Sequence, residues 1–335
     1  MLFRDKNTKF KRVLTFIIIL TLFAFSKDFI LQIPQGFPTP YIPEDNQLTT
    51  SRVELGRKLF FDKIMSRDSS VSCASCHVPA FAFTDRLTKG KGIRDQEVGR
   101  NTPTLTNVAY QDKFLWDGVN PSLVAQVMIP IHETNEFDFH IILLAERMKK
   151  DSTYVKLCKE AYNSEPNPYA ITHSIASFER TLLSGNSPYD QFHFQGDKSV
   201  LNSSEKRGMD LFFNKLHCTE CHSGFNFTNN SLTNNGLYQN YLDSGRIRLT
   251  YLETDRAVFK VPTLRNIELT YPYMHDGSIK TLEDVVSHYM NGGKNHENKS
   301  EIIKPFELTK QEKSDLIHFL ESLTDSTFIN TNYEK

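Results

Sequence analysis

The chain has 335 residues, which is enough for two domains of ordinary size. Hydrophobic residues make up 39% of it and charged residues 24%, as in soluble globular proteins. The formal net charge of −1 and the lack of a basic stripe with interleaved aromatic residues argue against nucleic acid as a partner.

The N-terminal segment has the pattern of an export signal. Five basic residues within positions 4–12 precede an apolar run over residues 13–25. A membrane-spanning helix needs roughly 20 apolar residues, whereas a secretory signal joins a basic stretch to a shorter apolar one. We therefore expect a signal peptide over residues 1–26, with an uncleaved anchor as the alternative, and a periplasmic protein in either case.

The first motif with chemical meaning is a C-x-x-C-H formed by Cys73, Cys76 and His77. Two thiols at this spacing can bond to the two vinyl groups of haem, while the adjacent histidine supplies an axial nitrogen to the iron. The alternatives are a redox dithiol or half of a zinc site. A redox dithiol would need a βαβ pattern around it, which the sequence lacks.

A polar segment follows this motif at residues 126–136 and contains Gln126, His132, Glu133 and Glu136. A carboxylate downstream of a haem motif is what acid–base chemistry at the iron requires. We expect residues 171–192 to close the first domain as a helix and residues 196–205 to be a polar linker. Cys158, which lies outside the motifs, is expected to be a buried small side chain.

A second C-x-x-C-H, formed by Cys218, Cys221 and His222, lies in matching surroundings. ELGRKLFFDK (54–63) precedes the first motif and KRGMDLFFNK (206–215) precedes the second. Residues 103–127 also align with residues 262–286 without a gap, with Trp116 opposite His275. The repeat predicts a mainly α fold of two tandem cytochrome c-like domains, over residues 45–195 and 196–325, each with one covalent haem c.

Helix-start patterns support this interpretation. Capping boxes are expected at Ser51 with Glu54, at Asn202 with Glu205, and at Thr309 with Glu312. The tail after Asp325 is expected to be frayed.

The motifs LGRKLFFDK, SCASCH, GRNTPTLTN, WDG, SFERTLLSG, VPTLRN, PYMHDG and TLEDVVSHY occur in this order. Over roughly residues 45–323 the chain resembles the bacterial dihaem cytochrome c peroxidase and MauG family. The resemblance implies a peroxidatic haem in the first domain and an electron-transfer haem in the second. It also implies hydrogen peroxide as substrate and a small cytochrome c or cupredoxin as electron donor, and it is compatible with a homodimer.

The resemblance also implies roles for individual residues. His77 and His222 would be the proximal iron ligands, Trp116 an electron relay between the haems, and Gln126 and Glu136 the polar residues of the peroxide site. Further family positions are His275 near the second haem, in a hydrogen-bonding role, and a calcium site at Asn101, Thr270 and Pro272. The last two would bind calcium through carbonyl oxygens, which this ion favours.

Two positions depart from the common family pattern. No histidine lies between His77 and Asn101, where many of these peroxidases have one that closes the first haem. Lys91 lies at roughly that place, but its amine must lose a proton before it can ligate iron, so we expect an open iron. At the second haem, Tyr289 occupies the distal-ligand position, with Met290 as the alternative and Met274 in the neighbouring turn.

The identity of this ligand separates two functions. Methionine favours a peroxidase, whereas tyrosine permits a MauG-like oxidase that acts on a protein substrate. We expect peroxide reduction first, the MauG-like oxidase second, and a dihaem electron carrier third.

Overall fold

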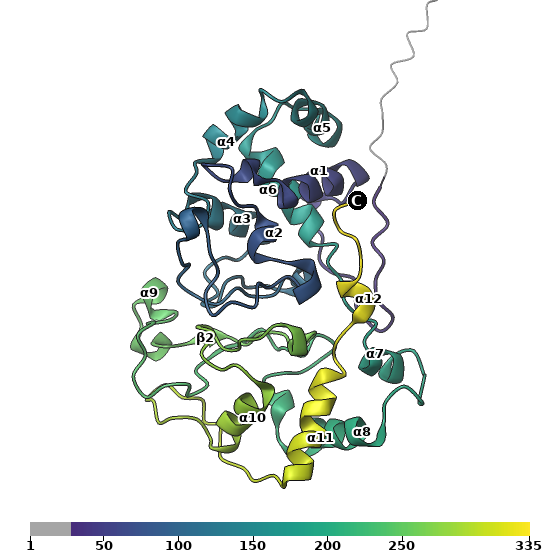
Figure 1. Ribbon diagram of the computed structural model, residues 1–335, viewed down its shortest axis with the longest axis vertical. Coiled ribbons are helices and arrows are strands. Elements are labelled where there is room, and N and C mark those ends of the chain that lie inside the picture. The colour runs from purple at the N-terminus through teal and green to yellow at the C-terminus, as the bar shows by residue number, and fades with distance from the viewer. Residues whose placement is uncertain (1–27) are drawn as a thin grey trace, which may run out of the picture.

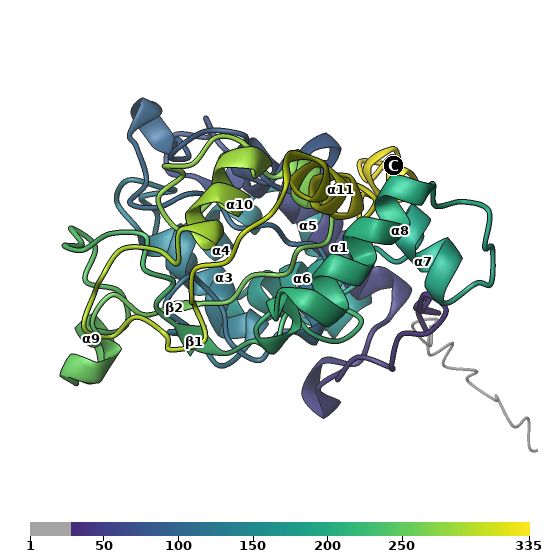
Figure 2. The same ribbon diagram turned by 90° about the horizontal axis from the view of Figure 1, so that it is seen from below.

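The computed structural model describes residues 28–335, so the expected signal peptide lies outside the described residues. Within this range, none of the helices has the length and apolar character needed to cross a membrane. Two helical lobes lie one above the other, with α1 to α6 in the upper lobe and α8, α10 and α11 in the lower (Figure 1). Figure 2 shows the molecule from below, with α8, α10 and α11 of the lower lobe toward the viewer. The helices are α1 (Thr50–Phe61), α2 (Cys73–Cys76), α3 (Leu123–His132), α4 (Ile141–Met148), α5 (Ser152–Tyr162), α6 (Pro168–Glu179), α7 (Pro188–His193), α8 (Ser203–Asp210), α9 (Ile247–Thr250), α10 (Leu282–Met290), α11 (Lys310–Glu321) and α12 (Ser326–Ile329).

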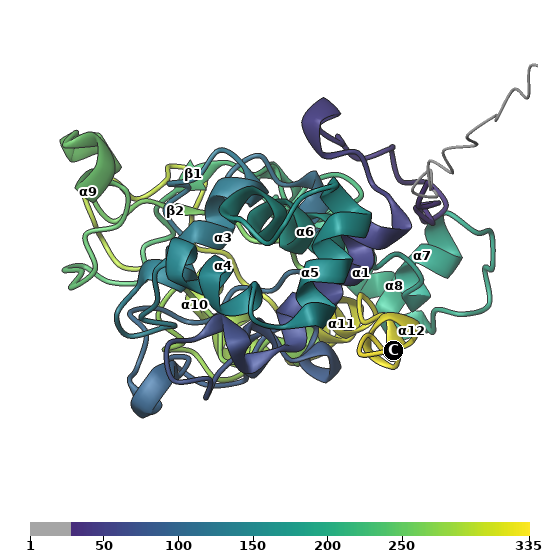
Figure 3. The same ribbon diagram turned by 90° about the horizontal axis from the view of Figure 1, so that it is seen from above.

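Strands are minor in the part of the chain that the structure describes. A two-residue pair, β1 (Leu232–Thr233) and β2 (Phe259–Lys260), is antiparallel and pairs Leu232 with Lys260. Figure 3 shows this pair at one side of the molecule, near the protruding α9. The mainly α fold expected from the repeat is therefore confirmed.

Each lobe is built around the same helix crossing. A Cβ atom added to Gly56 of α1 would lie 1.9 Å from the carbonyl oxygen of Ser174 in α6. In the lower lobe, a Cβ atom on Gly208 of α8 would lie 1.9 Å from the carbonyl oxygen of Asp315 in α11. Only glycine allows the two backbones to approach so closely, and the shared contact confirms the internal repeat.

The two P-T-L-x-N segments also have equivalent structures. Asn107 and Asn266 both have left-handed φ angles, 57° and 59°. The side-chain oxygen of Asn107 accepts a hydrogen bond of 2.8 Å from the amide of Ser184, and that of Asn266 accepts one of 2.8 Å from Asp325. Each asparagine thus fixes the chain just after the last long helix of its lobe.

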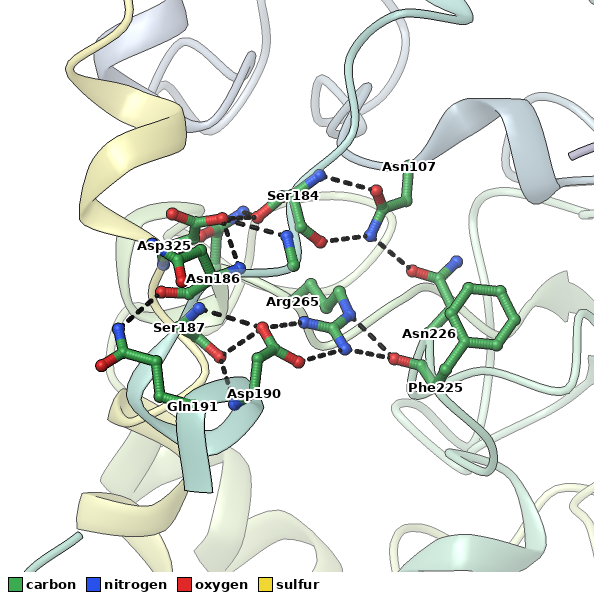
Figure 4. A network of polar contacts seen from close by, with 12 residues as sticks. Asn107, Ser184, Asn186, Ser187, Asp190, Gln191, Phe225, Asn226, Arg265 and Asp325 are labelled. Carbon is green, nitrogen blue, oxygen red and sulfur yellow. Dashed lines mark hydrogen bonds and ion pairs between the residues drawn. The ribbon is translucent and has the colours of Figure 1, made fainter. Parts of the chain in front are cut away.

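Asn107 belongs to a polar network between the lobes (Figure 4), and Asn266 joins it by donating to the hydroxyl of Ser184 at 3.1 Å. Asn107 donates to the side chain of Asn226 at 3.1 Å, and the Asp325 carboxylate accepts from the amides of Gly185 and Asn186 at 3.0 and 2.9 Å. Residues from both lobes therefore share one buried set of hydrogen bonds.

Beside this network, Arg265 and Asp190 form an ion pair at 2.8 Å with both side chains fully buried. A buried ion pair needs every charged atom satisfied, and Arg265 also donates to the carbonyl of Phe225 at 2.8 Å. The pair anchors α7 to the lower lobe.

Three local predictions were wrong. The first helix is capped by Thr49, whose side chain accepts from the Arg52 amide, so the expected box at Ser51 does not form. Residues 171–192 are not one helix, because the chain between α6 and α7 turns to join the network of Figure 4. The boxes at Asn202 and Thr309 are confirmed, as is the burial of Cys158.

The tail after Asp325 was the third error, because it is ordered and returns to the upper lobe. Phe328 of α12 is 3% exposed, and its ring centroid lies 5.6 Å from that of Phe83. The ring of Tyr333 lies 5.0 Å from that of Phe83. Figure 1 shows this yellow segment rising from α11 to α12 and on to the upper lobe.

Candidate functional site

A cavity of about 740 Å³ extends through both lobes. Its lining includes all six residues of the two motifs: Cys73, Cys76, His77, Cys218, Cys221 and His222. Most of the other lining side chains are apolar, and they come from the helices and loops of both halves. The cavity therefore brings together two motifs that are far apart in the sequence.

The two histidines are held in the same way. Nδ1 of His77 donates to the carbonyl oxygen of Phe83 at 2.9 Å, and Nδ1 of His222 donates to that of Phe227 at 3.1 Å. A carbonyl oxygen only accepts, so Nδ1 carries the hydrogen and Nε2 keeps a free lone pair. Burial lowers the pKa of both imidazoles, to about 4 for His222, so both remain neutral as iron ligation requires.

The motif cysteines are unsuited to redox exchange. None of the five cysteines forms a disulfide among the described residues. Burial raises the pKa of the thiols of Cys73 and Cys218, the latter to about 12, which opposes the thiolate that exchange or metal binding needs. In each motif the backbone amide of the histidine also donates a hydrogen bond of 2.9 Å to the carbonyl of the first cysteine. Paired thiols beside an oriented histidine on an apolar cavity fit covalent attachment of haem c.

Glu136 and Gln126 both line the cavity together with the first motif. Burial, with the nearby charge of Glu133, raises the pKa of Glu136 to about 7. The Gln126 side-chain oxygen accepts from Asn120 at 3.2 Å, which orients its amide. The loop at Gly92 packs on Glu136, whose carbonyl accepts from the Ile93 amide at 2.9 Å.

Trp116 lies where the lobes meet. Its indole nitrogen donates to the carbonyl of Asn101 at 2.8 Å, and its own carbonyl accepts from the amide of Lys260 at 2.6 Å. The ring lines the same cavity as both motifs. This position is compatible with an electron relay, which stays a prediction.

Tyr289 and Met290 of α10 lie in different surroundings. Tyr289 lines the cavity, whereas Met290 packs against the apolar core of the lower lobe. The repeat that pairs Pro103 with Pro262 pairs Met290 with Ile131, which belongs to the core of the upper lobe and also lines the cavity. Met274 lines the cavity too, and its sulfur accepts from the Asn235 side chain at 3.3 Å.

His275 is buried at the cavity wall, with its ring stacked 3.9 Å from that of Phe259. Its carbonyl accepts from the amide of Asn101, at 2.9 Å. Asn101, Thr270 and Pro272 all line this cavity, and the calcium site expected from them stays a prediction. No cluster of three acidic, histidine or cysteine side chains suited to a metal occurs in residues 28–335.

Sequence reasoning missed several residues of the cavity wall. Pro130 occupies the position in α3 that the repeat pairs with Tyr289, so the first half has no side-chain donor there. Lys260 is buried at the wall, and burial lowers the pKa of its amine to about 8. Arg100 lines the wall and bridges Asp117 at 2.8 Å and Asp243 at 2.6 Å, which ties the two halves together. The repeat offset was the signal that could have identified Pro130.

Comparisons with known proteins agree with this architecture. The family model described as di-haem cytochrome c peroxidase matches residues 50–199, and the cytochrome c model matches residues 205–324. The methylamine utilization protein MauG of Methylorubrum extorquens is 40% identical over 293 residues, which cover 87% of this chain and 82% of MauG. The chain belongs to the di-haem cytochrome c peroxidase and MauG family.

Two further relatives are a peroxidase and a MauG-like protein. The cytochrome c551 peroxidase of Nitrosomonas europaea is 36% identical over 276 residues, or 81% of this chain and 79% of that protein. The crystal structure of a MauG-like protein associated with microbial copper homeostasis superposes with a TM-score of 0.87 at 30% identity, covering 92% of this chain and 99% of the other. As a member of this di-haem family, the chain is an oxidoreductase, and its cytochrome c domains are of the kind that hold covalently bound haem c.

Proposed function

We propose that this chain is a periplasmic dihaem peroxidase that reduces hydrogen peroxide to water with electrons from a small cytochrome c or cupredoxin. Residues 45–195 would form the peroxidatic domain and residues 196–325 the electron-transfer domain, with His77 and His222 as the proximal ligands. A calcium ion at Asn101, Thr270 and Pro272, and a homodimer, belong to the same proposal.

The observation that carries the proposal is the half-buried acid at the first motif. Glu136 faces the cavity that contains His77, and its pKa is raised to about 7 by burial. An acid with this pKa can both accept and return a proton near neutral pH. A haem held by Cys73, Cys76 and His77 would supply the iron that binds peroxide and would pass on the electrons of the donor protein. Glu136 would take a proton from one peroxide oxygen and give it to the other, while Gln126 positions the peroxide.

The first haem has no side-chain donor at the position equivalent to Tyr289, because that residue is Pro130. Lys91 lies at the cavity wall, but its side chain is exposed to solvent. These features support an iron that is open to peroxide without prior reduction.

A steady-state assay with peroxide and a reduced cytochrome c or cupredoxin tests the proposal. The fully oxidised protein should also bind cyanide without pre-reduction, because its first iron is open. A protein that carries both haems but consumes no peroxide with any donor would instead be an electron carrier.

A MauG-like oxidase that acts on a protein substrate is the second candidate, and the position of Tyr289 favours it. Tyrosine is an anionic ligand that favours the higher oxidation states of iron, whereas methionine raises the reduction potential. We therefore predict that Tyr289→Met raises the potential of the second haem, whereas Met290→Leu leaves it unchanged, as measured by spectroelectrochemical titration. The reverse result would assign the ligand to Met290 and remove the support for this candidate.

A further inference from the structure

The internal repeat places Glu179 of α6 and Leu320 of α11 at equivalent positions. In the upper lobe, Gly56 packs on the backbone of Ser174 and then on the Cβ atom of Phe178, 3.0 Å from the position of an added Cβ. In the lower lobe, Gly208 packs in the same order on Asp315 and Phe319, with the latter at 2.8 Å.

Glu179 and Leu320 are the residues that follow these two phenylalanines, and both line the cavity. The lower lobe therefore has an apolar side chain where the upper lobe has a carboxyl group.

Glu179 is unusually isolated for an acid. It is only 8% exposed, and its Oε2 atom is buried without a hydrogen-bond partner among the described residues. Burial raises its pKa to about 8, although the charge of Arg180 opposes this shift. A carboxyl group buried without a partner is costly to ionise, so a packing role alone would be served better by leucine, as in the other lobe.

Glu179 lies near the first haem-attachment motif. Its charge is one of those that raise the pKa of the Cys73 thiol, which places the two groups at the same end of the cavity. Cys73 is an attachment residue that bonds to a vinyl group and does not ligate the iron.

The other charged groups at this end are few. Arg180 acts directly on Glu179, and Cys73 no longer titrates once it is a thioether. Glu136 is a second acid whose charge reaches Cys73, and Asp85 acts on the neighbouring Cys76. The ionisation of Glu136 therefore has to be removed by substitution before the titration of Glu179 can be measured.

We propose that Glu179 binds one proton from solvent when the first haem is reduced by one electron, and that this proton coupling is confined to the first haem. The ferric haem core has one positive charge, which favours the carboxylate of Glu179. Reduction removes this charge, and in a buried site of low dielectric the carboxylate then takes up a proton. One electron enters the haem and one O–H bond forms on Glu179, so charge is conserved.

The use of this proton depends on the proposed function. Reduction of one peroxide to two waters consumes two electrons and two protons. Glu179 would bring a proton into the cavity together with an electron, whereas Glu136 moves a proton between the peroxide oxygens. Glu179 is thus a positioning residue for the proton supply and need not touch peroxide.

The test is a redox titration of the holoprotein at a series of pH values on both sides of neutrality, in a Glu136→Gln background. The potential of the first haem should fall as pH rises, by up to about 59 mV per pH unit for one proton and one electron. Both Glu179→Gln and Glu179→Leu should remove this slope, whereas Glu146→Gln, a change of an exposed acid on α4, should keep it.

The reciprocal variant Leu320→Glu should create a slope at the second haem. A pH-independent first haem, or a slope that survives both Glu179 variants, would overturn the proposal. Because the titration uses no peroxide, a protein that shows the slope but consumes no peroxide would refute only the proposed function.

Discussion

Glu136 illustrates how burial prepares a single side chain for chemistry. The pKa of its carboxyl group is raised mainly by burial at the cavity wall, and the charge of its sequence neighbour Glu133 adds to this shift. We predict that Glu136→Gln slows the reaction of the oxidised protein with peroxide by about 10²- to 10⁴-fold, since glutamine cannot exchange a proton. Stopped-flow spectroscopy measures this rate, and Glu146→Gln is the exposed control. A wild-type rate in the Glu136 variant would exclude it as the acid–base residue.

Trp116 should affect a different step. Trp116→Phe keeps an aromatic ring but loses the indole donor to the Asn101 carbonyl, and phenylalanine is harder to oxidise. We predict an unchanged reaction with peroxide and slower electron delivery from the second haem. The two rates can be followed separately by rapid mixing with half-reduced protein. If electron delivery stays at the wild-type rate, Trp116 is a structural residue of the lobe boundary.

At the residue scale, the sequence predicts functional residues well where a motif fixes the spacing between them. The C-x-x-C-H motifs and the Glu136 segment could be found because adjacent or nearby residues share one task. Pro130 could be identified only through the repeat offset, which pairs it with Tyr289. Glu179 could not be identified, because it lies outside the aligned segments and its counterpart Leu320 is recognised only from the helix packing at Gly56 and Gly208.

Among the helix contacts, the crossing of α1 and α6 at Gly56 is highly sensitive to a small substitution. We predict that Gly56→Ala destabilises the protein by about 1–3 kcal/mol, because a methyl group would collide with backbone rather than with a movable side chain. Urea unfolding followed by circular dichroism measures the loss. Glu54→Ala, an exposed change in the same helix, should alter stability by less than about 0.5 kcal/mol. Equal effects of the two variants would contradict the close approach.

Helix existence could be predicted from the sequence, whereas helix ends were less certain. The boxes at Asn202 and Thr309 formed because their partners lie three residues away. The first helix began two residues early because Thr49 can accept from the Arg52 amide equally well. The break between α6 and α7 depends on Asn107 and Asp325, which lie far away in the chain, so no local pattern could reveal it.

At the scale of the whole molecule, the chain after α11 returns from the lower lobe and packs beside the first haem-attachment motif. Phe328 and Tyr333 pack on Phe83, and the carbonyl of Phe83 accepts the hydrogen bond that orients His77. The sequence could not predict this contact, because 245 to 250 residues separate the partners and the tail has no pattern beyond a few aromatic residues.

We predict that deletion of residues 326–335 alters the absorption and redox potential of the first haem while the second keeps its properties. Phe328→Ala should have the same effect more weakly, with a loss of roughly 3–5 kcal/mol in stability. Tyr251→Ala, at a residue that is 86% exposed, is the control. Equal changes at both haems, or none at either, would show that the tail does not support His77.

The returning tail also sets an order of events during biosynthesis. Residues 326–333 emerge from the ribosome only after both C-x-x-C-H motifs, and domains generally fold in the order in which they are made. The upper lobe therefore cannot complete the packing around Phe83 until the lower lobe has been synthesised. The two rings that pack on Phe83 therefore become available only after both C-x-x-C-H motifs have been made.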